Sequence, residues 1–327
     1  GFFVDSFPRK KVLLICYGLF TIFFGGYLAA GSLLLFTLVR TLHGAPFGAS
    51  TVANSTVAID VLHPTRRAEG IGYYGLSNNI ASAIAPALAI YLLNITHNYN
   101  LLFWLAFLTS AIGLGINATL KLNPRELIKD KPKISLDRFF LLKGWSEGLS
   151  MMCLSFSYGV TATYVAIYGK ETLNISGGSA LFFMLLSLGL ILSRLVGSRT
   201  LRQGKITQNA SVGILISLCG YLMFALLQNP IGYYCSAFIV GLGNGHMWPA
   251  YQTMFLNLAP HTQRGTANSS ILISWDIGVG LGTLIGGAIA EHCGYQQAFI
   301  ASALVNLIGI IIFFGYAKND FLKNKLR

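Results

Sequence analysis

The chain of 327 residues is strongly apolar, with 54% hydrophobic residues, 10% charged residues and a mean hydropathy of +0.62. A soluble domain carries about 25% charged residues, so this composition excludes an ordinary soluble protein and favours a chain that crosses a membrane many times. The five cysteines lack the spacing of a metal or redox site, and we interpret them as packing residues.

Ten apolar runs are long enough to cross a bilayer as helices, because a hydrocarbon core about 30 Å thick needs roughly 20 residues per helix. Strands are excluded because the runs are long and do not alternate between polar and apolar residues. We therefore predict an all-α integral membrane fold with ten visible spans, at 12–30, 33–58, 70–93, 101–120, 145–168, 180–197, 206–227, 230–256, 266–290 and 297–317.

One long polar stretch, 121–143, separates four of these runs from the other six. It carries seven Lys or Arg residues, and each of them in hydrocarbon would cost roughly 2.5–3.5 kcal/mol. We predict that it is a cytoplasmic loop between an N-terminal half, 1–120, and a C-terminal half, 144–327.

The positive charges alternate in step with the predicted spans. Apart from Arg40 and Lys170, the 23 Lys and Arg residues lie at the chain ends, in the central loop or in every second loop. Such asymmetry marks the cytoplasmic side of a membrane protein. We therefore expect a multi-pass protein of a cytoplasmic (inner or plasma) membrane, surrounded by lipid, and we interpret the net charge of +12 as a topology signal rather than a nucleic-acid surface.

The two halves resemble each other at a constant offset of 197 residues, which predicts a parallel repeat of the kind found in transporters. The second half has six predicted spans and the first has four. The repeat therefore predicts that about 50 residues with two further helices precede Gly1 in the intact protein. The matching pairs are Gly44 and Gly241, Gly48 and Gly245, Arg67 and Arg264, Ser77 and Ser274, Asn79 and Asp276, and Ile80 and Ile277.

The stretch 1–11 resembles the G-x-x-x-D-R-x-G-R-R/K loop of the major facilitator superfamily. The positions that fit are Gly1, Asp5, Arg9 and Lys10, whereas Ser6 and Pro8 depart from the pattern. A second copy at 197–205 keeps Gly197 and Lys205 but has Leu201 where the aspartate is expected. Further similarities to this superfamily lie in R-x-x-x-G-x-x-x-G at 40–48, in the loop at 63–75 and in Ala85-Pro86, where proton antiporters carry a Gly-Pro motif.

The resemblance implies a fold of two six-helix, pseudo-symmetric halves, of which this chain lacks the first two helices. It implies a secondary transporter of the drug and sugar efflux branch that is not an enzyme and acts on a small organic solute. An ion gradient, of protons by this resemblance, would drive it without a cofactor, and we expect a monomer. The alternatives are a proton-coupled nutrient importer and a non-transporting receptor or scaffold on the same fold. A membrane ATPase is disfavoured, because no nucleotide-binding or metal-binding motif is present.

The loop motif further implies a conformational latch made by Gly1, Asp5, Arg9, Lys10, Gly197 and Lys205. Asp5 near a helix N-terminus would be favoured by the helix dipole and could pair across the two halves. The alternative is that the basic residues only hold the loop in the cytoplasm. Glu147, just inside a predicted helix start, we interpret as a solvated residue that the helix dipole favours.

Ionisable side chains inside the spans are the candidates for solute binding and proton coupling, because isolated charges in lipid are costly. Asp276 lies near the middle of its span, and its alternative role is a hydrogen bond between helices. Arg40 resembles an arginine with an implied role in proton transfer, and its alternative is a structural ion pair. The other candidates for the cavity lining are Asn79, His246, Trp248, Asn78 and Tyr73. A packed histidine is the alternative for His246.

Small residues recur at a spacing of four, which allows helices to approach closely. We predict helix packing at Gly44, Gly48, Gly241, Gly245, Gly278, Gly282 and Pro86. A dinucleotide loop is not expected, because these glycines lie in apolar spans without a strand before them.

Overall fold

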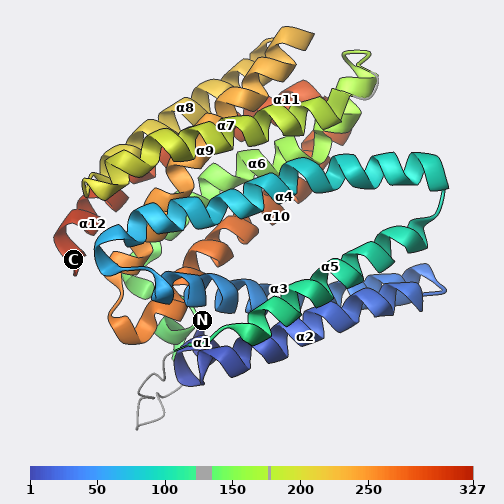
Figure 1. Ribbon diagram of the computed structural model, residues 1–327. Helices are drawn as coiled ribbons and strands as arrows, with labels where there is room; N and C mark the ends of the chain where they lie inside the picture. The colour runs from blue at the N-terminus through green and yellow to red at the C-terminus, as the bar shows by residue number, and fades with distance from the viewer. Residues whose placement is uncertain (123–134, 176–177, 327) are drawn as a thin grey trace. The chain divides into compact units, whose positions relative to one another are not determined.

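The computed structural model describes residues 1–122, 135–175 and 178–326, and all regular structure within these ranges is helical (Figure 1). Part of the predicted central loop, 123–134, lies outside the described residues. The helices are α1 (Phe2–Ser6), α2 (Arg9–Leu28), α3 (Leu33–Val61), α4 (Arg67–Thr96), α5 (Tyr99–Thr119), α6 (Trp145–Glu171), α7 (Gly178–Arg202), α8 (Ile206–Leu226), α9 (Pro230–Leu258), α10 (Arg264–Cys293), α11 (Tyr295–Ile312) and α12 (Lys318–Asn324).

Each of the ten predicted spans corresponds to one helix between α2 and α11, which confirms the all-helical prediction. Within the described residues, seven segments are long and apolar enough to cross a membrane by length and composition alone. They are Arg9–Leu28, Tyr99–Thr119, Leu142–Glu171, Ser179–Arg202, Ile206–Leu226, His261–Cys293 and Tyr295–Asn324.

The predicted repeat is visible in the helix boundaries. Shifting α3 (Leu33–Val61) by 197 residues gives the bounds of α9, and shifting α4 gives those of α10. The same shift takes the short 3₁₀ helix Pro64–Arg66 onto the 3₁₀ helix His261–Gln263. Equal boundaries at one constant offset show that these three elements recur in the same order in both halves.

The helices group into two compact units. The first contains Gly1–Val61, Ala87–Phe140 and His261–Ser269, and the second contains Leu62–Pro86, Leu141–Pro260 and Ser270–Arg327. In the first unit α2 packs along α3 and α5. In the second unit α8 packs in the same way along α9 and α11 (Figure 1), so the repeat extends from helix length to helix packing.

Aromatic side chains fill the core of the second unit. Phe224 lies at its centre, with its ring 4.6 Å from that of Phe299 and 5.6 Å from that of Tyr168. All three side chains are buried, and the edge-to-face pair of Phe224 and Phe299 adds about 0.5–1.5 kcal/mol beyond the burial of apolar area. The core therefore joins α6, α8 and α11 into a rigid group.

Glycines of the second unit lie where backbones cross closely. A Cβ atom on Gly241 would meet the carbonyl oxygen of Leu186, and one on Gly282 would meet the carbonyl oxygen of Phe156. Gly245 faces Ser193 in the same way, and Gly278 faces Ser155. For Gly44 and Gly48 the structure differs from the prediction. Both lie on the exposed face of α3, and no atom lies within 4 Å of a Cβ built there within the described part of the chain.

A π-helical turn, Phe313–Ala317, joins α11 to α12. Phe313, Ala317 and Phe321 are all buried at a spacing of four residues, so one side of the turn and of α12 faces the interior of the second unit. The π-helix hydrogen-bond pattern adds a residue to the turn without ending the helix.

Candidate functional site

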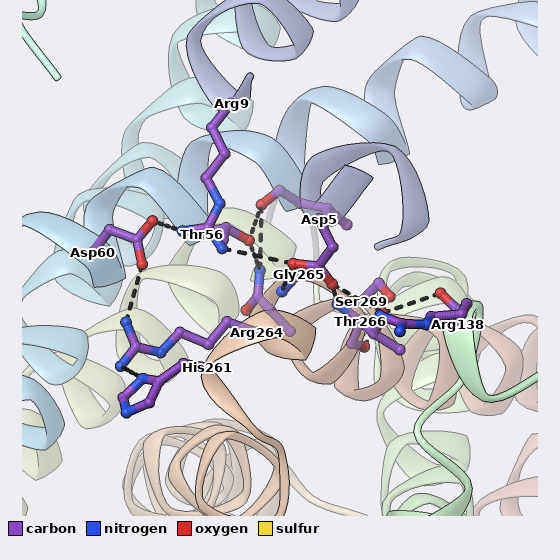
Figure 2. Close-up of polar contacts among 12 residues, drawn as sticks. Asp5, Arg9, Thr56, Asp60, Arg138, His261, Arg264, Gly265, Thr266 and Ser269 are labelled. Atoms are coloured by element: carbon purple, nitrogen blue, oxygen red, sulfur yellow. Dashed lines mark hydrogen bonds and ion pairs between the residues drawn. The ribbon is translucent and has the colours of Figure 1, made fainter. Parts of the chain in front are cut away.

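Asp5, at the end of α1, caps the N-terminus of α10 (Figure 2). Its carboxylate accepts hydrogen bonds from the backbone N–H groups of Gly265 and Thr266, at 2.9 and 2.8 Å, and lies 3.0 Å from the hydroxyl of Thr266. The Asp5 side chain is 1% exposed. The first amides of a helix lack intrahelical partners and carry partial positive charge, so a buried carboxylate is stabilised there.

A chain of alternating charges extends from this cap, as Figure 2 shows. Arg9 lies 3.6 Å from the Asp5 carboxylate and also forms an ion pair with Asp60, at the end of α3. Asp60 in turn pairs with Arg264 at 3.2 Å, and the guanidinium of Arg264 contacts the ring of His261. Charge-assisted hydrogen bonds are about twice as strong as neutral ones. Asp5 and Arg9 are buried whereas Asp60 is partly exposed, and together these contacts link α1, α2 and α3 to the start of α10.

Uncharged side chains also join α3 to the start of α10. The amide of Asn268, on α10, donates to the hydroxyl of Ser55 at 2.6 Å and lies 3.3 Å from that of Thr56. All three side chains are buried. The Thr266 hydroxyl also lies 3.0 Å from the carbonyl oxygen of Arg138, which attaches the end of the central loop. We call the group formed by Asp5, Arg9, Asp60, Arg264 and Thr266 the cap cluster.

The predicted latch residues are only partly brought together. Gly1 belongs with the cap cluster, because a Cβ there would lie 2.7 Å from the Cα of Thr266. The ammonium group of Lys10 instead donates to the carbonyl oxygen of Leu120, at the end of α5. Gly197 and Lys205 belong to the second unit, where Gly197 lies against His246 and Lys205 is exposed.

Asp60, Arg264 and Thr266 were not among the predicted latch residues. In the sequence, Arg264 is the repeat partner of Arg67, and Asp60 lies two residues beyond the predicted span 33–58. The repeat does not carry the acidic Asp60 position over to the second half. Asn257 occupies the position equivalent to Asp60, and its carbonyl oxygen accepts a hydrogen bond from the backbone of Leu326 at 2.8 Å.

Asp276, the predicted coupling residue, is exposed on α10, and it forms no hydrogen bond or ion pair with any described residue. The neighbouring Trp275 contacts two further aromatic rings, with centroids 5.1 Å from Trp248 and 5.2 Å from Tyr158. All three rings are half-buried. The prediction included Trp248 but missed Tyr158 and Trp275, whose contact joins α6 and α10 and has no signal in the local sequence.

The other predicted lining residues differ in their surroundings. The Nδ1 atom of His246 lies 3.0 Å from the side-chain oxygen of Asn209. The side-chain amide nitrogen of Asn209 also donates a hydrogen bond to the backbone carbonyl oxygen of His246 at 2.8 Å. These contacts favour a packed histidine over a residue that lines the cavity. Arg40, Asn78 and Tyr73 are exposed. The side chains of Asn79 and Pro86 lie outside the described part of the structure.

The family assignment follows from comparison with known proteins. The profile described as Major Facilitator Superfamily matches residues 1–281 and 234–325, which together span nearly the whole chain. The chain belongs to this superfamily. It is therefore a multi-pass membrane protein and a secondary transporter of a small molecule rather than an enzyme.

Two relatives of this superfamily member have names that refer to export or drug resistance. The staphylopine export protein of Staphylococcus aureus is 21% identical over 270 residues, which are 78% of this chain and 67% of that protein. The multidrug resistance protein MdtG of Erwinia billingiae is 30% identical over 98 residues, which are 30% of this chain and 24% of that protein.

Solved structures confirm the superfamily fold. The crystal structure of the human organic anion transporter MFSD10 (TETRAN) matches with a TM-score of 0.79 at 14% identity, over 95% of this chain and 78% of that one. The transporter FucP, crystallised in its outward conformation, matches with a TM-score of 0.72 at 13% identity, over 97% of this chain and 84% of that one. These identities are low, so the two structures speak for the fold alone.

Proposed function

We propose that this transporter exports a small organic solute in exchange for protons, as a monomer in a cytoplasmic membrane. The observation that carries the proposal is Asp276, a titratable group in the middle of a membrane-spanning helix that is exposed and has no protein partner among the described residues. An isolated carboxyl at that depth is costly in lipid, so it is expected to face water and solute. The two relatives named for export or drug resistance favour efflux as the direction.

A group of three aromatic rings from α6, α9 and α10 supports a binding role. Tyr158, Trp248 and Trp275 present half-buried rings in mutual contact, and Trp275 directly precedes Asp276 in the chain. Solute sites combine apolar and aromatic walls with a few polar groups that fix orientation. A solute with an apolar body and at least one polar group would fit such a lining.

Proton-linked flux tests the proposal. The full-length protein is reconstituted in liposomes that contain a pH-sensitive dye, and organic cations, organic anions and sugars are added in turn. Antiport predicts that at least one solute class collapses an imposed pH gradient by moving protons against the solute. Protons that move together with the solute would establish the importer instead. Absence of both solute and proton movement with every class would favour the receptor or scaffold.

We also propose that the cap cluster is the conformational latch of the transport cycle. It joins the end of α1 to the start of α10, residues 260 positions apart in the chain, through a buried carboxylate. Hydrogen bonds to charged groups contribute about 1.5–3 kcal/mol each, and about 1.4 kcal/mol changes an equilibrium tenfold. A latch of this strength would hold one conformation firmly and still be released by solute or proton binding.

Asp5→Asn is expected to weaken the latch, because it removes the charge and one of the two acceptor oxygens that face α10. The amide hydrogens of Gly265 and Thr266 should then exchange with solvent at least about tenfold faster, as a loss of about 1.5 kcal/mol requires. Hydrogen exchange followed by mass spectrometry measures this directly. Glu171→Gln, which removes a negative charge from the exposed end of α6, should leave these amides unchanged. Unaltered exchange in Asp5→Asn would show that the carboxylate does not hold the helix start.

A further inference from the structure

Glu147 lies in the first turn of α6 and is completely buried, with 0% of its surface exposed. This corrects the interpretation of Glu147 as a solvated residue. Two neighbouring elements shield the start of α6 from solvent. The 3₁₀ turn Leu142–Gly144 precedes it, and the ring of Phe255, from α9, lies so close to Gly144 that a Cβ there would come within 2.6 Å of it. The position of Glu147 in the sequence does not reveal that Phe255, from another helix, covers the start of α6.

The carboxyl group of Glu147 has little to compensate a negative charge. Its Oε2 accepts one hydrogen bond from the hydroxyl of Ser146 at 3.1 Å, and its Oε1 has no partner. No Lys, Arg or His among the described residues forms an ion pair with it. The surrounding titratable groups do not stabilise a negative charge on Glu147 either, because Asp320 of α12 adds like charge and Tyr251 of α9 is neutral.

The magnitudes favour the neutral carboxyl. A buried carboxylate without a cation costs several kcal/mol even after the protein relaxes. The dipole of α6 favours an anion at its first turn, but such an effect contributes about 0.3–2 kcal/mol. The penalty exceeds the gain, so burial favours the protonated form of the carboxyl in this conformation.

Nearby hydroxyl groups argue for a proton rather than a sodium ion. The Ser150 hydroxyl, one turn along α6, lies 2.7 Å from the hydroxyl of Tyr251 and 2.8 Å from the carbonyl oxygen of Gly309. These oxygens are buried and bonded to one another. A metal cation needs several oxygens turned towards it, whereas a proton needs only the free Oε1 of Glu147.

We propose that Glu147 is a second proton-binding site of this transporter, distinct from Asp276. The proton is bound to the carboxyl while the start of α6 is covered. It leaves to water, with rupture of one O–H bond and formation of the carboxylate, when that end of the helix becomes hydrated. The use of this proton in coupling rests on the proposed function, but its presence does not.

Infrared difference spectroscopy tests for the proton. The full-length protein in lipid at neutral pH should show a carbonyl stretching band of a protonated carboxylic acid that moves in D₂O. The band should be lost in Glu147→Gln and retained in the matched variant Glu171→Gln, which lies at the exposed end of the same helix. Identical carboxylic-acid bands in the wild type and Glu147→Gln would overturn the proposal.

Thermal unfolding gives an independent measurement. A group that is protonated when folded and ionised when unfolded makes the folded state bind more protons, so stability falls as pH rises. Wild-type protein should therefore lose more stability than Glu147→Gln between acidic and neutral pH. Stabilisation of the wild type by NaCl over KCl that is absent in Glu147→Gln would identify a sodium site and overturn the proposal. Neither measurement depends on transport, so failure of the flux test and failure of this proposal are distinguishable.

Discussion

Asp276→Asn is expected to abolish transport driven by a pH gradient while the protein remains folded. Asparagine preserves the size and polarity of the side chain, but it cannot bind and release a proton. Because Asp276 is exposed and forms no bond with any described residue, its replacement removes no stabilising contact that the structure shows. Exchange of solute across the membrane without a gradient should continue, since that step needs only the binding site. The measurement compares gradient-driven flux with equilibrium exchange in liposomes.

Two control variants sharpen this comparison. Asp276→Glu keeps the titratable group and should retain gradient-driven flux with a changed pH profile. Glu291→Gln removes an exposed negative charge near the end of the same helix and should leave both activities intact. Normal gradient-driven flux with normal pH dependence in Asp276→Asn would remove Asp276 from the coupling mechanism.

Gly282→Ala is expected to disrupt the packing of α10 against α6. The new Cβ would fall on the carbonyl oxygen of Phe156, which belongs to the backbone of a long helix and cannot rotate away. Inserting atoms into a close-packed contact costs about 1–3 kcal/mol and sometimes more. We expect a large loss of monodisperse protein and a lowered unfolding temperature.

Gly280 provides the matched control, because it lies two residues away on the same helix and a Cβ there meets no atom within 4 Å. Gly280→Ala should be neutral or slightly stabilising, since alanine is favoured over glycine in helices by about 0.5–1 kcal/mol. Size-exclusion profiles and thermal unfolding measure both variants. Equal behaviour of the two would show that the helices can separate without cost.

Helices and their order could be predicted from the sequence because both depend on local properties. The bilayer thickness sets the length of each apolar run, and the constant offset of 197 residues relates α3 to α9 and α4 to α10. The partner of Asp5 could not be predicted in this way. Its contact with Gly265 joins positions 260 residues apart, and no local pattern specifies which helix start a carboxylate will cap.

Burial inside the spans was the other property that the sequence did not determine. Glu147 was interpreted as solvated, because a helix start in a membrane protein usually faces water. His246 was a candidate for the cavity lining, but Asn209 of α8 forms hydrogen bonds with it. In both cases the environment comes from neighbouring helices, whose positions depend on packing rather than on the run of residues around the side chain.

The π-helical turn Phe313–Ala317 has a consequence for the angular phase of α12. Each residue of an α-helix turns the chain by about 100°, so one residue more or less before α12 would rotate every later side chain by about that angle. With the turn present, Phe321 stays on the buried side and the charge of Asp320 acts on Glu147. The extra residue therefore helps to place the charge of Asp320, which adds to the effect of burial on Glu147.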